Sequence, residues 1–124
     1  MSTAPQRLSL GRDRRIRCGR DFALVRQTGQ RLAHGCLIAN WKALPAGSPS
    51  RLGVITSRKV GNAVVRNRAR RLLRESFRRH QLELAAPVDL VLVARPSIAG
   101  KSFSDVEREF LSAARKAGLL KTGL

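Results

Sequence analysis

The chain has 124 residues, which suits one compact domain, and 43% of them are hydrophobic. Lys and Arg number 25 against eight Asp and Glu, so the formal net charge is +17. Self-repulsion of that size opposes compaction, which indicates a polyanionic partner and favours nucleic acid over an anionic membrane surface. No apolar run approaches the roughly 18 residues of a membrane span, and residues 1–15 lack the apolar stretch of a signal peptide. We therefore expect a cytoplasmic protein with no membrane partner.

The first half of the chain predicts a basic arm, a short helix and an extended stretch. Residues 1–13 are predicted to be a flexible basic arm, and a single domain is predicted over residues 14–120, with a tail at 121–124. A helix is expected from Arg20 to Thr28, where Gly29 supplies a stop. One extended stretch follows over residues 31–43, in which Trp41 faces the core and Asn40 the opposite side.

The second half predicts a loop, two strands and two helices. Turn-forming residues fill 45–50, and a strand is expected over residues 51–57. The nearly continuous apolar run at 88–95 predicts a buried strand. The last helix is expected to open at Ser104 with a capping box to Glu107.

The long central helix is predicted from an N-cap at Asn62 to about Leu84. At about 100° per residue, its apolar positions share one arc. They are Val65, Ala69, Leu72, Leu73 and Phe77, with Ser76 among them. The arginines lie outside this arc, with Arg66 at its boundary and Arg68, Arg70, Arg71, Arg74, Arg78 and Arg79 opposite.

This basic face is interpreted as a ligand-binding surface. A solvated charged face would mix signs, yet only Glu75 opposes the seven arginines between residues 66 and 79. Like charges four residues apart destabilise an isolated helix, so the pattern favours a bound anion. At the helix start, Arg58 and Lys59 cluster where the macrodipole disfavours cations, a conflict that a bound phosphate would relieve. Asn67 can both donate and accept hydrogen bonds, to a phosphate, a 2′-hydroxyl or a base edge.

The sequence of residues 59–68, KVGNAVVRNR, continuing to Arg70, Arg71 and Arg74, resembles the signature of the bacterial ribonuclease P protein family. Residues 14–29 look like the first helix of that family and residues 88–96 like its last strand, so the resemblance covers roughly residues 14 to 120. It implies an α/β (α+β) two-layer sandwich like the second domain of ribosomal protein S5, with a left-handed strand–helix–strand crossover, against the usual preference. It also implies a protein subunit that assists a catalytic RNA in endonucleolytic removal of the 5′ leader from precursor tRNA.

The resemblance also assigns residues to two RNA-binding surfaces. Contacts with RNA are implied for Arg58, Lys59, Asn62, Arg66, Asn67, Arg68, Arg70, Arg71 and Arg74. A cleft between the first helix and the sheet would bind the single-stranded leader, and its residues would be Phe22, Arg26, Ile38 and Asn40. Arg26 and Asn40 stand where aromatic residues are familiar in the family. Stacking on an aromatic side chain contributes about 1–3 kcal/mol per base, and Arg26 and Asn40 supply no aromatic ring. We therefore expect binding of the leader to depend more on charge and hydrogen bonding here. Phe22 itself suits either the core or the cleft.

The sequence predicts no protein catalytic residues and no metal site. Cys18, Cys36, His34 and His80 lack zinc-site spacing, which predicts free thiols in a reducing compartment. Neither histidine shows an acid–base partner, and the carboxylates are scattered, whereas two-metal chemistry needs them to converge. We expect the RNA subunit and its Mg²⁺ to perform the chemistry, with no cofactor bound by the protein itself.

Three other classes of protein would also explain a basic helix. A non-catalytic ribosomal or translation-associated RNA-binding protein of the same fold would not stimulate cleavage of precursor tRNA. A DNA-binding protein with its helix in a major groove predicts a dimer seam. Every apolar stripe here is needed for one core, so we expect a monomer. A membrane-surface helix would be revealed by lipid binding.

Overall fold

The computed structural model describes residues 14–16 and 19–121, so the predicted arm, residues 122–124 of the predicted tail and Cys18 lie outside the described residues. The helices are α1 (Gly19–Thr28), α2 (Ala63–His80) and α3 (Phe103–Lys116). The strands are β1 (Gln30–His34), β2 (Leu37–Ala43), β3 (Arg51–Ile55) and β4 (Val88–Ala94). Two short 3₁₀ turns are η2 (Gln81–Glu83) and η3 (Pro96–Ile98). Along the described chain, no helix has the length and apolarity needed to cross a bilayer.

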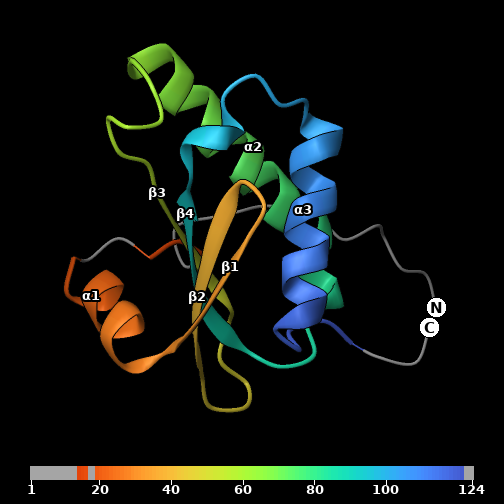
Figure 1. Ribbon diagram of the computed structural model, residues 1–124. Helices are drawn as coiled ribbons and strands as arrows, with labels where there is room; N and C mark the ends of the chain where they lie inside the picture. The colour runs from red at the N-terminus through yellow and green to blue at the C-terminus, as the bar shows by residue number, and fades with distance from the viewer. Residues whose placement is uncertain (1–13, 17–18, 122–124) are drawn as a thin grey trace.

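The four strands form one mixed sheet in the order β1-β2-β4-β3. The pairs β1–β2 and β2–β4 are antiparallel, whereas β3 and β4 are parallel neighbours joined through α2. Helices α2 and α3 cover one face of the sheet, and α1 lies against the other (Figure 1). The predicted α+β sandwich is confirmed, while the hand of the β3–α2–β4 crossover stays a prediction.

The prediction of a single extended stretch over residues 31–43 was wrong, because this segment is a hairpin. His34 pairs with Leu37, and Gly35 between them has a φ of 58°, which a glycine adopts without strain. The alternation of facing residues continues on both sides of this two-residue turn, which is why periodicity alone did not show the break.

Element ends also differ from the predictions. Helix α2 ends at His80, four residues before the predicted end, because residues 81–83 tighten into a 3₁₀ turn. The capping box of α3 belongs to Ser102 and not to Ser104: the Ser102 hydroxyl accepts the Asp105 N–H at 3.1 Å, and Asp105 accepts the Ser102 N–H at 3.3 Å. This earlier start places Phe103 in the first turn of α3, where the Arg79 guanidinium lies 4.8 Å from its ring centre.

The main core lies between the sheet and the helices α2 and α3. The predicted apolar arc of α2 is confirmed: Ala69, Leu73, Ser76 and Phe77 are buried, and Val65 and Leu72 pack at the margin. Trp41 belongs to this core as predicted. The other large buried side chains of the cluster include Leu37, Leu90, Leu92, Ile98, Val106 and Phe110. The long helix is therefore held by its apolar arc, which leaves its remaining surface outside the core.

Ion pairs of Arg51 tie α1 to the other face of the sheet. Asp89 on β4 is 5% exposed and accepts two hydrogen bonds from Arg51 on β3, at 2.8 and 2.7 Å. Arg51 also donates to Asp21 of α1 at 3.4 Å. The pair with Arg51 compensates the charge of Asp89, which would be costly to bury alone. The contact of Arg51 with Asp21 holds the start of α1 over β3 and β4.

Cys36 is a free thiol within the hairpin turn, as predicted for this residue. Burial, reinforced by the nearby Glu109, raises the pKa of Cys36 to about 12. Glu109 accepts the Cys36 N–H at 2.7 Å and pairs with Lys101 at 3.1 Å. A thiol so seldom ionised is a structural residue.

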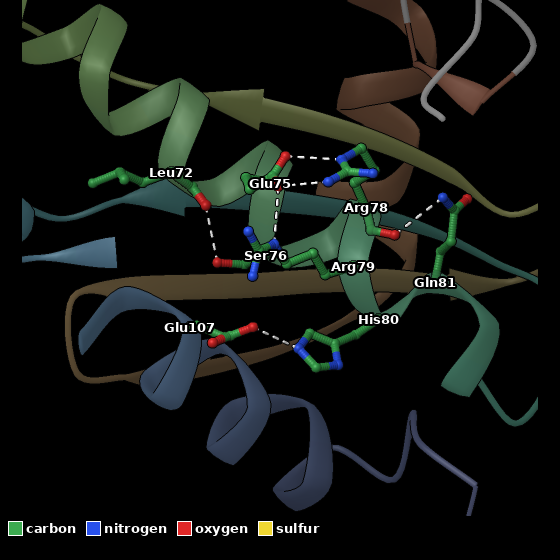
Figure 2. A network of polar contacts seen from close by, with 8 residues as sticks. All are labelled: Leu72, Glu75, Ser76, Arg78, Arg79, His80, Gln81 and Glu107. Atoms are coloured by element: carbon green, nitrogen blue, oxygen red, sulfur yellow. Dashed lines mark hydrogen bonds and ion pairs between the residues drawn. The ribbon is translucent and has the colours of Figure 1, made fainter. Parts of the chain in front are cut away.

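His80 joins α2 to α3, as Figure 2 shows for its contact with Glu107. Its two ring nitrogens lie 2.5 Å from Glu83 of η2 and 2.8 Å from Glu107 of α3. The expectation that neither histidine has an acid partner was therefore wrong for His80; Glu107 is 27 residues away, which local patterns do not reveal. Burial disfavours the charged ring, but the hydrogen bonds and charges of the two carboxylates outweigh it and raise the pKa of His80 above its ordinary value.

The raised pKa of His80 predicts a stability that depends on pH. The contribution of the ion pairs is fully present below the unfolded pKa of about 6.5 and is lost as pH rises through the higher folded pKa. We expect the difference in unfolding free energy between the parent protein and His80→Gln to shrink as pH rises above about 6.5. Urea unfolding of both proteins at several pH values above and below about 6.5 measures this difference. A difference that does not change with pH would contradict the ion pairs of His80 as its source.

Candidate nucleic-acid interface

The turn before α2 is rigid and presents two basic side chains. Gly61 has a φ of 151°, and a Cβ there would lie 2.9 Å from the Val65 side chain, so a glycine is required. Asn62 is the N-cap as predicted: its side-chain oxygen accepts the Val65 N–H at 3.0 Å. Val60 is buried in the main core. The exposed Arg58 and Lys59 are thus carried on an anchored turn.

The outer surface of α2 carries an arginine ridge, defined here as Arg66, Asn67, Arg70, Arg71 and Arg74. Arg70 donates to the Thr56 hydroxyl at 2.6 Å and also to the Asn67 side chain. Arg71 is exposed, and the buried Nε of Arg66 has no hydrogen-bond partner among the described residues. Within the described part of the chain, no carboxylate forms an ion pair with these four arginines.

The acids of the protein neutralise other basic groups. Each of the seven carboxylates among residues 14–16 and 19–121 has a basic partner outside the ridge. The pairs are Asp21 and Asp89 with Arg51, Glu75 with Arg78 and Arg79, Glu83 and Glu107 with His80, Glu109 with Lys101, and Asp105 with Arg108. The ridge therefore keeps its positive charge for an external anion.

Arg74 shows the electrostatic cost of this arrangement. Its side chain is partly buried, and this burial, together with the charges of Arg15 and Arg70, lowers the pKa of Arg74 below its ordinary value. Like charges held this close destabilise one another unless a counter-ion lies between them. A phosphate at this point would convert the repulsion into shared attraction.

Three hollows meet at Arg74: one lies toward α1 and β3, and the other two lie on α2. The first is a cavity of about 230 Å³ toward α1, lined by Arg15, Ile16, Phe22, Leu52, Gly53, Val54 and Arg74. The second, of about 460 Å³, is lined by Val64, Asn67, Arg70, Arg71 and Arg74. The third, of about 610 Å³, is lined by Arg15, Arg71, Leu72, Arg74, Glu75, Arg78 and Phe103, and is called here the Phe103 hollow. A strand of nucleic acid following these hollows would meet Arg15, which sequence patterns did not single out, because it comes to Arg74 only through its bridge to Leu52 on β3.

Some predicted RNA contacts already have partners within the protein. Arg68 donates to the Lys101 carbonyl at 2.8 Å, on the side of α2 that faces α3. Arg78 and Arg79 both bind Glu75, as Figure 2 shows. Among the described arginines of α2, those that form no ion pair therefore lie in its first three turns, and a contact of Arg68 with RNA stays a prediction.

The four predicted leader-binding residues all belong to α1 or to the sheet face beneath it, but they are not gathered at one point. Phe22 is half-buried with its ring over Gly53, where a Cβ would lie 2.5 Å from the ring. Asn40 is buried, Ile38 is partly exposed, and β4 separates both from β3. Arg26 is exposed in the last turn of α1. Phe22 thus packs against the sheet and also lines the first cavity, and its contact with the leader stays a prediction.

Comparisons with known proteins agree with this geometry. The family model for ribonuclease P matches residues 10–118. The ribonuclease P protein component of Syntrophomonas wolfei is 38% identical over 110 residues, which cover 89% of this chain and 92% of that protein. The ribonuclease P protein of Thermotoga maritima superposes with a TM-score of 0.72 at 30% identity, covering 82% of this chain and 96% of that one. The Staphylococcus aureus protein, at 24% identity and a TM-score of 0.78, shares the fold over 87% of this chain and 98% of its own.

The mixed sheet, the anchored glycine–asparagine turn and the unpaired arginine ridge define a small basic RNA-binding protein. The chain belongs to the ribonuclease P protein family, as the resemblance of residues 59–74 predicted. None of these matches favours the ribosomal or translation-associated alternative.

Proposed function

We propose that this chain is the protein subunit that joins a ribonuclease P RNA, binds the 5′ leader of precursor tRNA and assists removal of that leader. The observation that carries the proposal is the arginine ridge, whose charge no described carboxylate neutralises. Ribonuclease P RNA presents the phosphate backbone that such a surface requires. We also propose that the free protein is a monomer in the cytoplasm. The monomer is supported by the burial of apolar side chains in two clusters within the chain.

The chemistry belongs to the RNA subunit with its Mg²⁺, and the protein positions the substrate. In support, each described carboxylate binds a basic side chain of the protein, and His80 connects two helices. General acid–base or two-metal catalysis would need such groups to converge on a reacting phosphate. Screening of phosphate repulsion by the ridge is the contribution that this geometry supports.

The leader would approach the ridge from the α1 side. The cavity between Phe22, Arg15 and Arg74 combines an aromatic edge with two guanidinium groups, which suits a base and its phosphates. Arg26, Ile38 and Asn40 extend this face away from the ridge, and their contact with the leader stays part of the proposal.

Reconstitution tests the proposed function. Added to a bacterial ribonuclease P RNA at low Mg²⁺, the protein is expected to stimulate removal of the 5′ leader from precursor tRNA, because the arginines replace part of the counter-ion screening. Binding to the RNA subunit should weaken by about 10³-fold when salt rises from about 50 to about 200 mM. A protein that binds RNA with this salt dependence but does not stimulate cleavage would favour the ribosomal alternative; a flat salt response would contradict the interface itself.

A further inference from the structure

The Phe103 hollow differs from the rest of the basic surface because it combines apolar, cationic and anionic groups. Phe103 and Leu72 supply apolar surface, Arg71 and Arg74 border it on the side of the ridge, and Glu75 supplies a carboxylate. A pure phosphate site would exclude a carboxylate, because like charges repel. The hollow therefore suits a ligand with a flat apolar body and hydrogen-bond donors, next to an anionic chain.

The aromatic wall of the hollow is held in place. Phe103 is the first residue of α3, its side chain is half-buried, and the guanidinium of Arg79 lies 4.8 Å from its ring centre. Arg79 is itself fixed by Glu75, whose Oε2 accepts its Nε–H at 2.9 Å. A preorganised ring loses little conformational entropy when another ring packs against it.

The carboxylate of Glu75 retains acceptor capacity. Its Oε1 accepts one hydrogen bond from Arg78 at 2.8 Å, and its Oε2 accepts one from Arg78 at 2.6 Å and one from Arg79. A carboxylate offers about four acceptor positions, so one remains on Oε1. Hydrogen bonds from Arg78 and Arg79 lower the pKa of Glu75 to about 2. At neutral pH the carboxylate is therefore ionised and can accept hydrogen bonds but cannot donate one.

We propose that the Phe103 hollow binds one unpaired nucleobase of RNA, with the ring against Phe103 and Leu72, a base amino group donating to Oε1 of Glu75, and the flanking phosphates on Arg71 and Arg74. The proposal rests on the RNA-binding role given above and adds a base preference to it. Cytosine presents an amino group where uracil presents a carbonyl oxygen, which Glu75 would repel. The site thus favours cytosine over uracil at a position beside the ridge.

Binding of short RNA to the full-length protein tests this preference. With hexacytidylate and hexauridylate as probes in fluorescence anisotropy, the parent protein should bind the cytosine oligomer about tenfold more tightly, the effect of one hydrogen bond to a charged group. In Glu75→Gln the preference should fall to within about twofold, because the amide can turn either its oxygen or its NH₂ to the base. Phe103→Leu keeps an apolar side chain and should weaken binding of both oligomers by at least about fivefold, from lost stacking.

The control is Glu83→Gln, which removes the same charge at an exposed carboxylate that pairs with His80 and does not line the hollow. If Glu75 acts only by lowering the net charge, both Glu variants will tighten binding of both oligomers equally, and the proposal fails. It also fails if the parent protein does not distinguish the two oligomers, a result that needs no variant to fold. Leader-removal assays on the same samples separate the two proposals: stimulation without base preference overturns only this site, and base preference without stimulation overturns only the proposed function.

Discussion

Replacing Arg66, Arg70 and Arg74 together with Ala is expected to make the salt dependence of RNA binding shallower. The magnitude of the slope of log affinity against log salt should fall by about two to three. Each phosphate that the protein no longer neutralises removes about 0.7 to 0.9 from that slope. These three side chains lie one turn apart along one edge of α2, and no described carboxylate binds them. Stability should hold or rise, because the substitutions remove like-charge repulsion at Arg74 and introduce a strong helix former.

The matched control removes three exposed arginines elsewhere: Arg31 on β1, and Arg108 and Arg115 on α3. The control variant and the ridge variant have the same net charge. Comparing their RNA binding therefore distinguishes binding at the ridge from general electrostatic attraction to RNA. Binding should be measured with the ribonuclease P RNA subunit at several salt concentrations. Equal losses of affinity and slope in both variants would show that the ridge is not the interface.

Replacing Arg51 with Met is expected to destabilise the fold by about 3 kcal/mol, because it leaves the buried Asp89 without its partner. Asp89 is 5% exposed, and both of its oxygens accept from Arg51. Since Arg51 also reaches Asp21, the substitution should loosen α1 over the sheet. Urea unfolding followed by circular dichroism measures the loss.

A second variant decides whether the unpaired charge is the cause. Arg51→Met combined with Asp89→Leu removes both charges and should recover most of the lost stability, because a well-packed apolar pair replaces a buried ion pair at little cost. Asp21→Asn, which alters only the outer contact at 3.4 Å, should cost far less than Arg51→Met. No recovery in the double variant would assign the loss to packing.

Features that depend on neighbouring residues could be predicted from the sequence. The N-cap at Asn62, the apolar arc of α2 and the opposite faces of Asn40 and Trp41 follow from helical and strand periodicity, and the structure has all of them. The binding of Arg78 and Arg79 by Glu75 also lies within one helical turn. The spacing of Glu75, Arg78 and Arg79 therefore predicts these two ion pairs. The interpretation of the basic face as continuous was nevertheless wrong for Arg78 and Arg79.

The sequence likewise determined the positive charge of α2 and the family of the chain. Charge follows from composition, and the motif is a run of neighbouring residues. Only the tertiary structure decided which basic groups remain unpaired. Arg68 binds the carbonyl of Lys101, His80 binds Glu107, and Arg15 comes to Arg74 along the edge of β3. These partners are far apart in the chain, and their meeting depends on strand order and helix packing, which hydrophobic periodicity does not encode.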